Sequence, residues 1–134
     1  MVEELPDTSS SYPKIVTFST LASGTTTHQD RIEVDDDMSL IFAKIQIPPG
    51  ESTGWHYHQG PVLIVVQSGK LKHTMKSGET QHITEGSAFI EPFGEEASHI
   101  GYNEMRTPLI LYAAYLLPAG APLAIATDGP ESVG

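Results

Sequence analysis

The stretch GESTGWHYH, Gly50 to His58, contains the pattern around which the rest of the chain is organised. Alternate residues of an extended strand point to the same face, so we expect His56 and His58 to project side by side. Two imidazoles so placed can share one divalent ion. A third histidine, His99, follows the turn Pro92-Phe93-Gly94, which ends one strand and lets another begin beside the first. The sequence therefore predicts a metal site formed by His56, His58 and His99.

The remaining sequence predicts an all-β fold. Short apolar segments alternate with turn residues, and no segment has a convincing helical period. The predicted strands cover residues 15–18, 31–34, 40–47, 62–67, 70–76, 81–83, 88–91 and 109–117. We expect a β-sandwich or barrel over residues 13–117, after a flexible tail at residues 1–12 and before a C-terminal extension at residues 118–134. Asp35, Asp36 and Asp37 are expected in a solvated turn, because the spacing of a calcium-binding EF-hand loop is absent.

The amino-acid composition limits which partners and which metal ligands the protein can have. The chain of 134 residues has the length of one domain, and its 17 acidic against 7 basic residues argue against nucleic acid or an anionic membrane surface. Without cysteine there is no disulfide framework and no thiolate nucleophile, so metal ligands must come from His, Asp, Glu or Gln. The N-terminus lacks the apolar core of a signal peptide, and no apolar run has the length of a membrane span. We expect a cytoplasmic protein that acts on a small molecule.

Two spaced motifs resemble those of the cupin superfamily. The first motif is G, five residues, H-x-H, three or four residues, E, six residues, G, and all but its Glu are matched here, by Gly50, His56, His58 and Gly69. The second motif is matched by Gly86, Pro92, Gly94, His99 and Asn103, with four residues before the histidine where two are usual. The resemblance covers residues 40–117, and residues 116–123 are also similar to the ending of small single-domain cupins. It implies a double-stranded β-helix, or jelly-roll, barrel.

The missing motif glutamate bears on the reaction that the resemblance implies. It would fall at Val62 or Leu63. Three neutral imidazoles leave up to three coordination positions for water, dioxygen or a chelating substrate. Such sites resemble those of cysteine, diketone and gentisate dioxygenases, which use Fe(II). Other variant cupins are lyases, isomerases or polyketide cyclases that use Mn, Ni or Zn.

The resemblance therefore implies one divalent transition metal, Fe(II) before Mn, Ni or Zn, and a dioxygenase before a redox-neutral lyase, isomerase or cyclase. The alternative is a non-catalytic module that binds a small molecule or a metal. A pure binding protein has no need of three metal ligands, so the three histidines favour an enzyme.

Two further residues are candidates for catalysis. Glu91 directly precedes Pro92, and if it lies inward it can act as a general base or accept a hydrogen bond from a metal-bound water. The alternative is an edge or buried carboxylate paired with a neighbour. His73 shares a strand face with Leu71 and Met75, so it is either a core histidine or a pocket residue that binds substrate or moves a proton.

The pocket is expected to be apolar. We expect its lining to include Val62, Ile64, Val66, Leu71, Met75 and Phe89. Neither Arg31 nor Arg106 lies in a motif, although a small carboxylate substrate normally meets a bidentate arginine. A neutral or phenolic, fairly apolar substrate that chelates the metal is therefore expected. Trp55 and Tyr57 are expected on the face opposite the histidines.

Apolar residues expected on the outward faces of the strands predict that the protein forms oligomers. Leu63 and Val65 alternate with the expected core residues and are apolar, which favours a homodimer formed through the barrel sheets.

Overall fold

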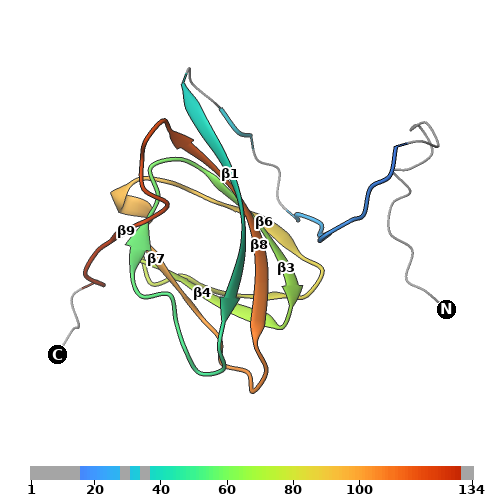
Figure 1. Ribbon diagram of the computed structural model, residues 1–134. Coiled ribbons are helices and arrows are strands. Elements are labelled where there is room, and N and C mark those ends of the chain that lie inside the picture. The colour runs from blue at the N-terminus through green and yellow to red at the C-terminus, as the bar shows by residue number, and fades with distance from the viewer. Residues whose placement is uncertain (1–15, 28–30, 34–36, 131–134) are drawn as a thin grey trace.

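The computed structural model describes residues 16–27, 31–33 and 37–130 and contains two antiparallel sheets that enclose a common interior (Figure 1). The four-stranded sheet has the order β1-β8-β3-β6, with β1 Met38–Ile47, β8 Leu109–Pro118, β3 Val62–Ser68 and β6 Ala88–Glu91. The five-stranded sheet has the order β5-β4-β7-β2-β9, with β5 Thr80–Thr84, β4 Lys70–Met75, β7 His99–Tyr102, β2 His56–Tyr57 and β9 Ile125–Ala126. A short 3-10 helix, η1 Glu95–Ala97, precedes β7. The all-β prediction is confirmed.

The longest pairing sets the frame of the molecule. β1 and β8 pair over their full lengths, from Met38 opposite Pro118 to Ile47 opposite Leu109. Every second residue of β8 is buried between the sheets, including Leu109, Leu111 and Leu117. Successive side chains of a strand point to opposite faces of the sheet. The register of this pairing therefore fixes which side chains of β1, β8 and β3 point to the interior.

One glycine determines how the chain leaves the H-x-H strand. A side chain at Gly60 would collide with the carbonyl oxygen of Leu116, so only glycine lets the loop pass this close to β8. The loop then enters β3 at Val62, whose side chain is fully buried. The turn that follows His58 is therefore held against the same strand that supplies much of the core.

The N-terminal strands were predicted wrongly. Residues 16–18 and 31–33 form no strand, and Ile15 and Val34 lie outside the described residues, as do the expected tail at residues 1–12 and His28, Asp35 and Asp36. The edge strand of the four-stranded sheet is instead β1, residues 38–47. Thr25 makes a single parallel bridge to Ser87 beside β6.

The C-terminal extension contributes to the second sheet. Ile125 and Ala126 pair with Tyr57 and His56, so β9 is the edge strand next to the H-x-H pair. In the part of the chain that the structure describes, no helix has the length and apolar character needed to cross a membrane.

Candidate metal centre

The structure brings the three predicted histidines together. His56 lies on β2 directly opposite His99 on β7, and His58 follows β2. The ring centroids are 4.9 Å apart for His56 and His58, 4.5 Å for His56 and His99, and 5.2 Å for His58 and His99. His58 and His99 are only 3% and 1% exposed, and His56 is partly buried. The three histidines predicted from the two sequence motifs therefore lie together in space.

Each of the three rings is held by a backbone carbonyl. The Nδ1 atoms of His56, His58 and His99 donate to the carbonyl oxygens of Gly54 at 2.9 Å, Leu123 at 2.8 Å and Ala97 at 2.9 Å. A carbonyl oxygen only accepts, so Nδ1 carries the proton in each neutral ring and Nε2 keeps its lone pair. A hydrogen bond of this kind to the second ring nitrogen is typical of histidines that bind a metal through Nε2.

Glu91 lies against the free nitrogens. It is the last residue of β6 and is 6% exposed. Its Oε1 lies 3.1 Å from Nε2 of His58, and its Oε2 lies 3.0 Å from Nε2 of His99. Neither Nε2 atom makes a well-directed hydrogen bond with any residue that the structure describes. Buried acceptor atoms so close together are stabilised by a cation between them.

His73 completes the cluster from β4. It is 4% exposed, and its Nε2 donates to Oε2 of Glu91 at 2.9 Å. Its ring stacks on His99 with centroids 4.8 Å apart and meets Phe89 edge-on at 5.2 Å. Both residues expected to take part in catalysis, His73 and Glu91, therefore reach the histidine cluster, and Glu91 takes the inward orientation of the two considered.

The electrostatics favour an ionised carboxylate at Glu91. Burial acts to raise the pKa of Glu91, but the nearby rings of His58, His73 and His99 outweigh burial and hold that pKa well below the usual value. Burial lowers the pKa of His56. For His99, burial also acts to lower the pKa, but the Glu91 carboxylate overcomes it and raises the pKa above its usual value.

The residues fit a divalent transition metal. Three imidazoles and one carboxylate are the donors that Fe, Mn, Ni and Zn accept. Donor atoms bound about 2.1 Å from one ion lie about 3.0 to 3.4 Å apart, and the distances from Glu91 to His58 and His99 fall in this range. The candidate ligand atoms of His56, His58 and His99 all lie within 4.8 Å of one another, as do those of His73, Glu91 and His99.

The cluster opens into a pocket of about 340 Å³. Its apolar lining is only partly as predicted, since Ile64 and Leu71 line it, whereas Val62 and Val66 are fully buried in the core. The lining residues outside the cluster are Ile45, Thr53, Trp55, Ile64, Leu71, Gly101, Leu111, Tyr115, Ala124 and Ala126. Met75 is not among them, and Phe89 faces a different cavity.

Trp55 lines the pocket, so the expectation that it points away from the histidines was wrong. β2 contains only His56 and Tyr57, and Gly54 has a positive φ of 76°. Trp55 therefore lies outside the strand, and the alternation of side chains between the two faces does not extend to it. Tyr115 was missed as a pocket residue, although its inward position follows from the alternation along β8; its ring lies edge-on to His58 at 5.7 Å.

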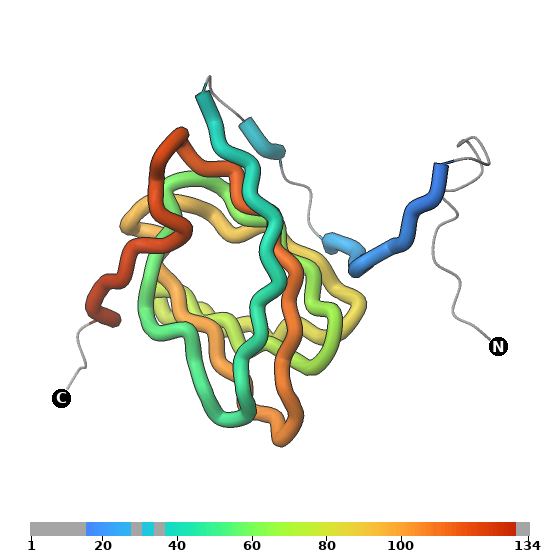
Figure 2. Tube along the Cα trace, in the orientation of Figure 1, coloured from blue at the N-terminus to red at the C-terminus, as the bar shows by residue number. Residues whose placement is uncertain are grey.

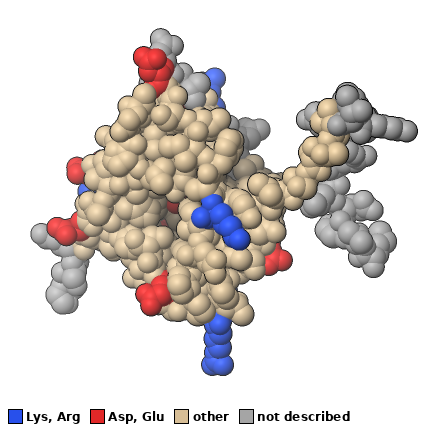
Figure 3. Space-filling model, in the orientation of Figure 1, with Lys and Arg blue, Asp and Glu red and all other residues tan. Residues whose placement is uncertain are grey.

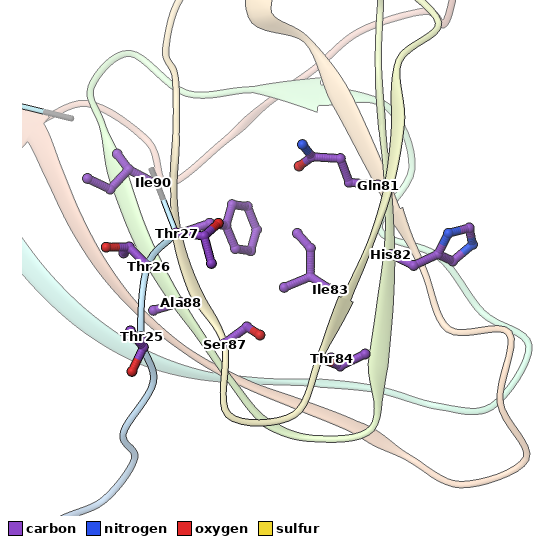
Figure 4. A pocket seen from close by; sticks show the side chains of 11 residues that line it. Thr25, Thr26, Thr27, Gln81, His82, Ile83, Thr84, Ser87, Ala88 and Ile90 are labelled. Carbon is purple, nitrogen blue, oxygen red and sulfur yellow. The ribbon is translucent and has the colours of Figure 1, made fainter. Parts of the chain in front are cut away.

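A second cavity, of about 480 Å³, lies between β5 and β6 (Figure 4). Threonines 25 to 27 close one side, and Ile83 and Thr84 of β5 face it from the other. His82 belongs to its lining but points outward, with Nε2 3.7 Å from Oε1 of Glu104. This cavity holds none of the metal-donor clusters found among the described residues.

Two antiparallel sheets with donors gathered at one end of their shared interior define the class of double-stranded β-helix proteins. Within that class the chain belongs to the cupin family, whose domain model matches residues 43–116. A comparison with curated protein sequences found no match.

Solved structures agree with the fold. An uncharacterized conserved protein with a double-stranded beta-helix domain from Klebsiella pneumoniae is 23% identical, with a TM-score of 0.54 over 72% of this chain and 80% of that one. A predicted oxalate decarboxylase from Thermotoga maritima is 31% identical, with a TM-score of 0.50 over 57% of this chain and 65% of that one. The polyketide cyclase RemF from Streptomyces resistomycificus is 18% identical, with a TM-score of 0.57 over 75% of this chain and 71% of that one.

Proposed function

We propose that the protein is a metal-dependent enzyme acting on a small organic molecule, with His56, His58, His99 and Glu91 as the metal donors. One observation carries the proposal: each of the three rings is fixed by a backbone carbonyl so that Nε2 stays free, and a buried carboxylate lies beside two of these nitrogens. Glu91, supplied by β6, takes the part of the glutamate that the first motif lacks at Val62 or Leu63.

The bound ion supplies a Lewis acid or a site of dioxygen activation. The chain's own residues hold and shield it. His73 donates its Nε2 proton to Glu91 and so orients the carboxylate. Tyr115 on the pocket wall is protonated at neutral pH, as a tyrosine with the ordinary pKa is, and can donate a hydrogen bond; burial, and then the charge of Glu91, raise its pKa further.

The pocket supports a neutral or phenolic, fairly apolar substrate that chelates the metal. No Lys or Arg occurs among its described lining residues, so a substrate carboxylate would find no cationic partner apart from the ion. Leu71, Leu111 and Ile64 instead offer apolar surface. Tight binding of a simple amino acid would contradict this substrate class.

Two reactions are proposed within this class. The Fe(II)-dependent dioxygenase follows from the open coordination positions that a set of protein donors leaves for dioxygen and a substrate. Glu91 favours a redox-neutral lyase, isomerase or cyclase on Mn, Ni or Zn. It adds a negatively charged donor, so the proposed ligand set is no longer the three histidines alone that resemble the dioxygenase sites. The similarity to a predicted oxalate decarboxylase and a polyketide cyclase agrees with the second reaction. Oxygen consumption during turnover separates the two.

The first experiment is elemental analysis of untagged protein purified without chelator. We expect about one equivalent of iron, manganese, nickel or zinc. The metal should be lost in His56→Ala and retained in His82→Ala, a matched control because His82 is exposed and outside the cluster. Absence of stoichiometric metal from the wild type, or its retention in His56→Ala, would overturn the proposal in favour of a non-catalytic binding protein.

A further inference from the structure

The second cavity lies outside the proposed metal centre and has the size of a small-molecule site. Its volume of about 480 Å³ falls in the range of about 300–1,000 Å³ that is typical of ligand pockets. It lies between β5 and β6, which are the edge strands of the two sheets. The segment that ends at Thr27 reaches the body of the molecule here, where backbone hydrogen bonds join Thr25 to Gly86 and Ala88 (Figure 2).

One part of the cavity lining consists of neutral hydrogen-bonding groups. A hydroxyl both donates and accepts a hydrogen bond, and so does a side-chain amide, so these groups can bind the hydroxyls of a ligand in either role. Figure 4 shows the Gln81 side chain reaching into the cavity from β5, across from the threonines of the N-terminal segment. Five hydroxyl side chains and one amide belong to the lining: Thr25, Thr26, Thr27, Thr84, Ser87 and Gln81.

The other part of the lining is apolar. Ile83 of β5 and Phe89 and Ile90 of β6 line the cavity and are partly buried. Ile83 and Phe89 also pack against the buried core, so they offer a fixed apolar surface. An apolar surface beside neutral hydroxyl and amide groups matches a ligand with an apolar face and several hydroxyl groups at its edge. A sugar ring has this form, with C–H groups on its face and hydroxyls around it.

Charge argues against an ionic ligand. The chain has a net charge of −10, which repels anions, and an anion is normally held by Lys or Arg. The described lining of the second cavity includes no Lys, Arg, Asp or Glu, so neither an anion nor a cation finds an opposite charge there. The pairing of His82 with Glu104 lies outside the cavity, since His82 points outward.

The cavity touches the metal centre through two residues. Phe89 lies edge-on to His73 with ring centroids 5.2 Å apart, and His73 donates a hydrogen bond to Oε2 of Glu91 at 2.9 Å. Gln81 lies directly opposite His73 in the pairing of β4 with β5, so the two side chains share a face of the sheet. A ligand that packs on Phe89 and binds Gln81 therefore restrains the surroundings of the ring that positions Glu91.

We propose that the second cavity binds a neutral polyhydroxylated molecule of the size of a monosaccharide, and that its occupancy changes the affinity of the proposed donors for a metal. Gln81 and Thr84 hydrogen-bond the ligand's hydroxyls, and Ile83 and Phe89 pack on its apolar face. The binding site itself is independent of the proposed function, whereas the effect on metal affinity rests on it. Linkage requires the metal to change the affinity for the ligand by the same factor.

Titration of the metal-free, full-length protein, followed by ¹H–¹⁵N NMR, tests the binding site. The probes are D-glucose, D-galactose, D-mannose and myo-inositol. We expect saturable shifts at residues 25–27, 81–84 and 87–90 with at least one probe, at a dissociation constant on the order of millimolar, because hydroxyl hydrogen bonds replace equally good bonds to water. No saturable shift with any probe, or shifts confined to the pocket beside the histidine cluster, would overturn the site.

Gln81→Met removes the amide but keeps the length of the side chain, and should raise this dissociation constant at least about threefold. Thr84→Val, which removes a hydroxyl, should raise it as well. Gln46→Met is the matched control, because Gln46 is exposed on β1 and does not line the cavity. The dispersion of each NMR spectrum verifies that the variant is folded. Equal affinities in Gln81→Met, Thr84→Val and the control would overturn the assignment of the binding groups.

Zinc affinity, measured with and without a saturating concentration of the probe that binds, tests the link to the metal centre. We expect a change of at least about threefold, and the same factor in the affinity for the probe when zinc is present. Equal zinc affinities with and without the probe would overturn this link. A protein that binds no zinc at all would instead contradict the proposed function, and the shifts of the metal-free protein would still decide whether the second cavity is a binding site.

Discussion

At the scale of single residues, the site is unusual in where its carboxylate originates. Val62, near the expected position of the motif glutamate, is fully buried in the core, while Glu91 approaches His58 and His99 from β6. Val62 and Glu91 lie directly opposite each other in the pairing of β3 with β6. The carboxylate therefore comes from the neighbouring strand, at the same level of the sheet as the expected motif position, and lies within reach of His58 and His99.

Glu91→Gln should weaken metal binding while leaving the fold intact. The amide has nearly the same shape but no negative charge, so we expect at least a tenfold loss of affinity. Competition with a chromogenic chelator, using zinc as the probe, measures this. Glu104→Gln, which alters an exposed surface pair with Lys72, should bind zinc like the wild type. Equal affinities for the two variants would exclude Glu91 as a ligand.

His73→Phe should reveal whether His73 positions Glu91. The substitution keeps an aromatic ring against Phe89 and His99 but removes the donor to Glu91 Oε2. We expect a loss of about 1–3 kcal/mol in the free energy of unfolding, because a buried carboxylate oxygen loses its partner. Zinc affinity should fall by about tenfold, with partial recovery in His73→Gln, which retains a donor. If zinc affinity is unchanged in His73→Phe, His73 has only a packing role.

At the scale of elements, the short strand β9 helps to build the site. Its pairing with β2 is accompanied by hydrogen bonds from His58 to the Leu123 carbonyl and from the Thr127 amide to the Trp55 carbonyl. Trp55 then packs against Gly129, where a side chain would come within 2.5 Å of the indole Nε1. The segment after β8 therefore orients His58, one of the proposed metal donors, and shapes one wall of the pocket.

Gly129→Val should displace this segment. The added side chain overlaps the Trp55 indole, which we expect to lower the free energy of unfolding by about 1–3 kcal/mol. Trp55 is the only tryptophan of the chain, so its fluorescence reports the change directly. Emission should shift to longer wavelength as the indole becomes exposed, and zinc affinity should fall because His58 loses its orientation. Asp128→Ala, at an exposed neighbouring position, is the control; a wild-type spectrum for Gly129→Val would show that β9 does not hold Trp55.

At the scale of the whole molecule, polar and apolar side chains are separated in space. The interior between the sheets carries the proposed metal donors and the apolar core, whereas Leu40 and Phe42 of β1 point outward and are exposed. On the face of the molecule that Figure 3 shows, the acidic side chains lie mainly towards the edge of the view, whereas Glu91 is buried.

Metal affinity should rise with pH. A metal ligand must be neutral imidazole, and Glu91 raises the pKa of His99 above the usual 6.5 in the metal-free protein. A proton on His99 therefore competes with the ion even above pH 6.5, and this competition ends as pH rises through the folded-state pKa. Zinc titrations between about pH 6 and about pH 8 should show increasing affinity and proton release. The slope should be smaller in Glu91→Gln, where His99 loses the carboxylate; a pH-independent affinity would contradict this account.

Local patterns in the sequence were enough to predict the fold class, the family and the cluster of His56, His58 and His99. Alternation places His56 and His58 on one face of a strand, and the second motif brings His99 to the strand opposite. Tertiary structure alone decided the rest. Glu91 and His73 reach the site because β6 and β4 curve into the same interior from different sheets, and Trp55 joins them because β2 is too short to maintain alternation. The backbone partner of His58 comes from residue 123, and a contact across so many residues is fixed by packing rather than by local periodicity.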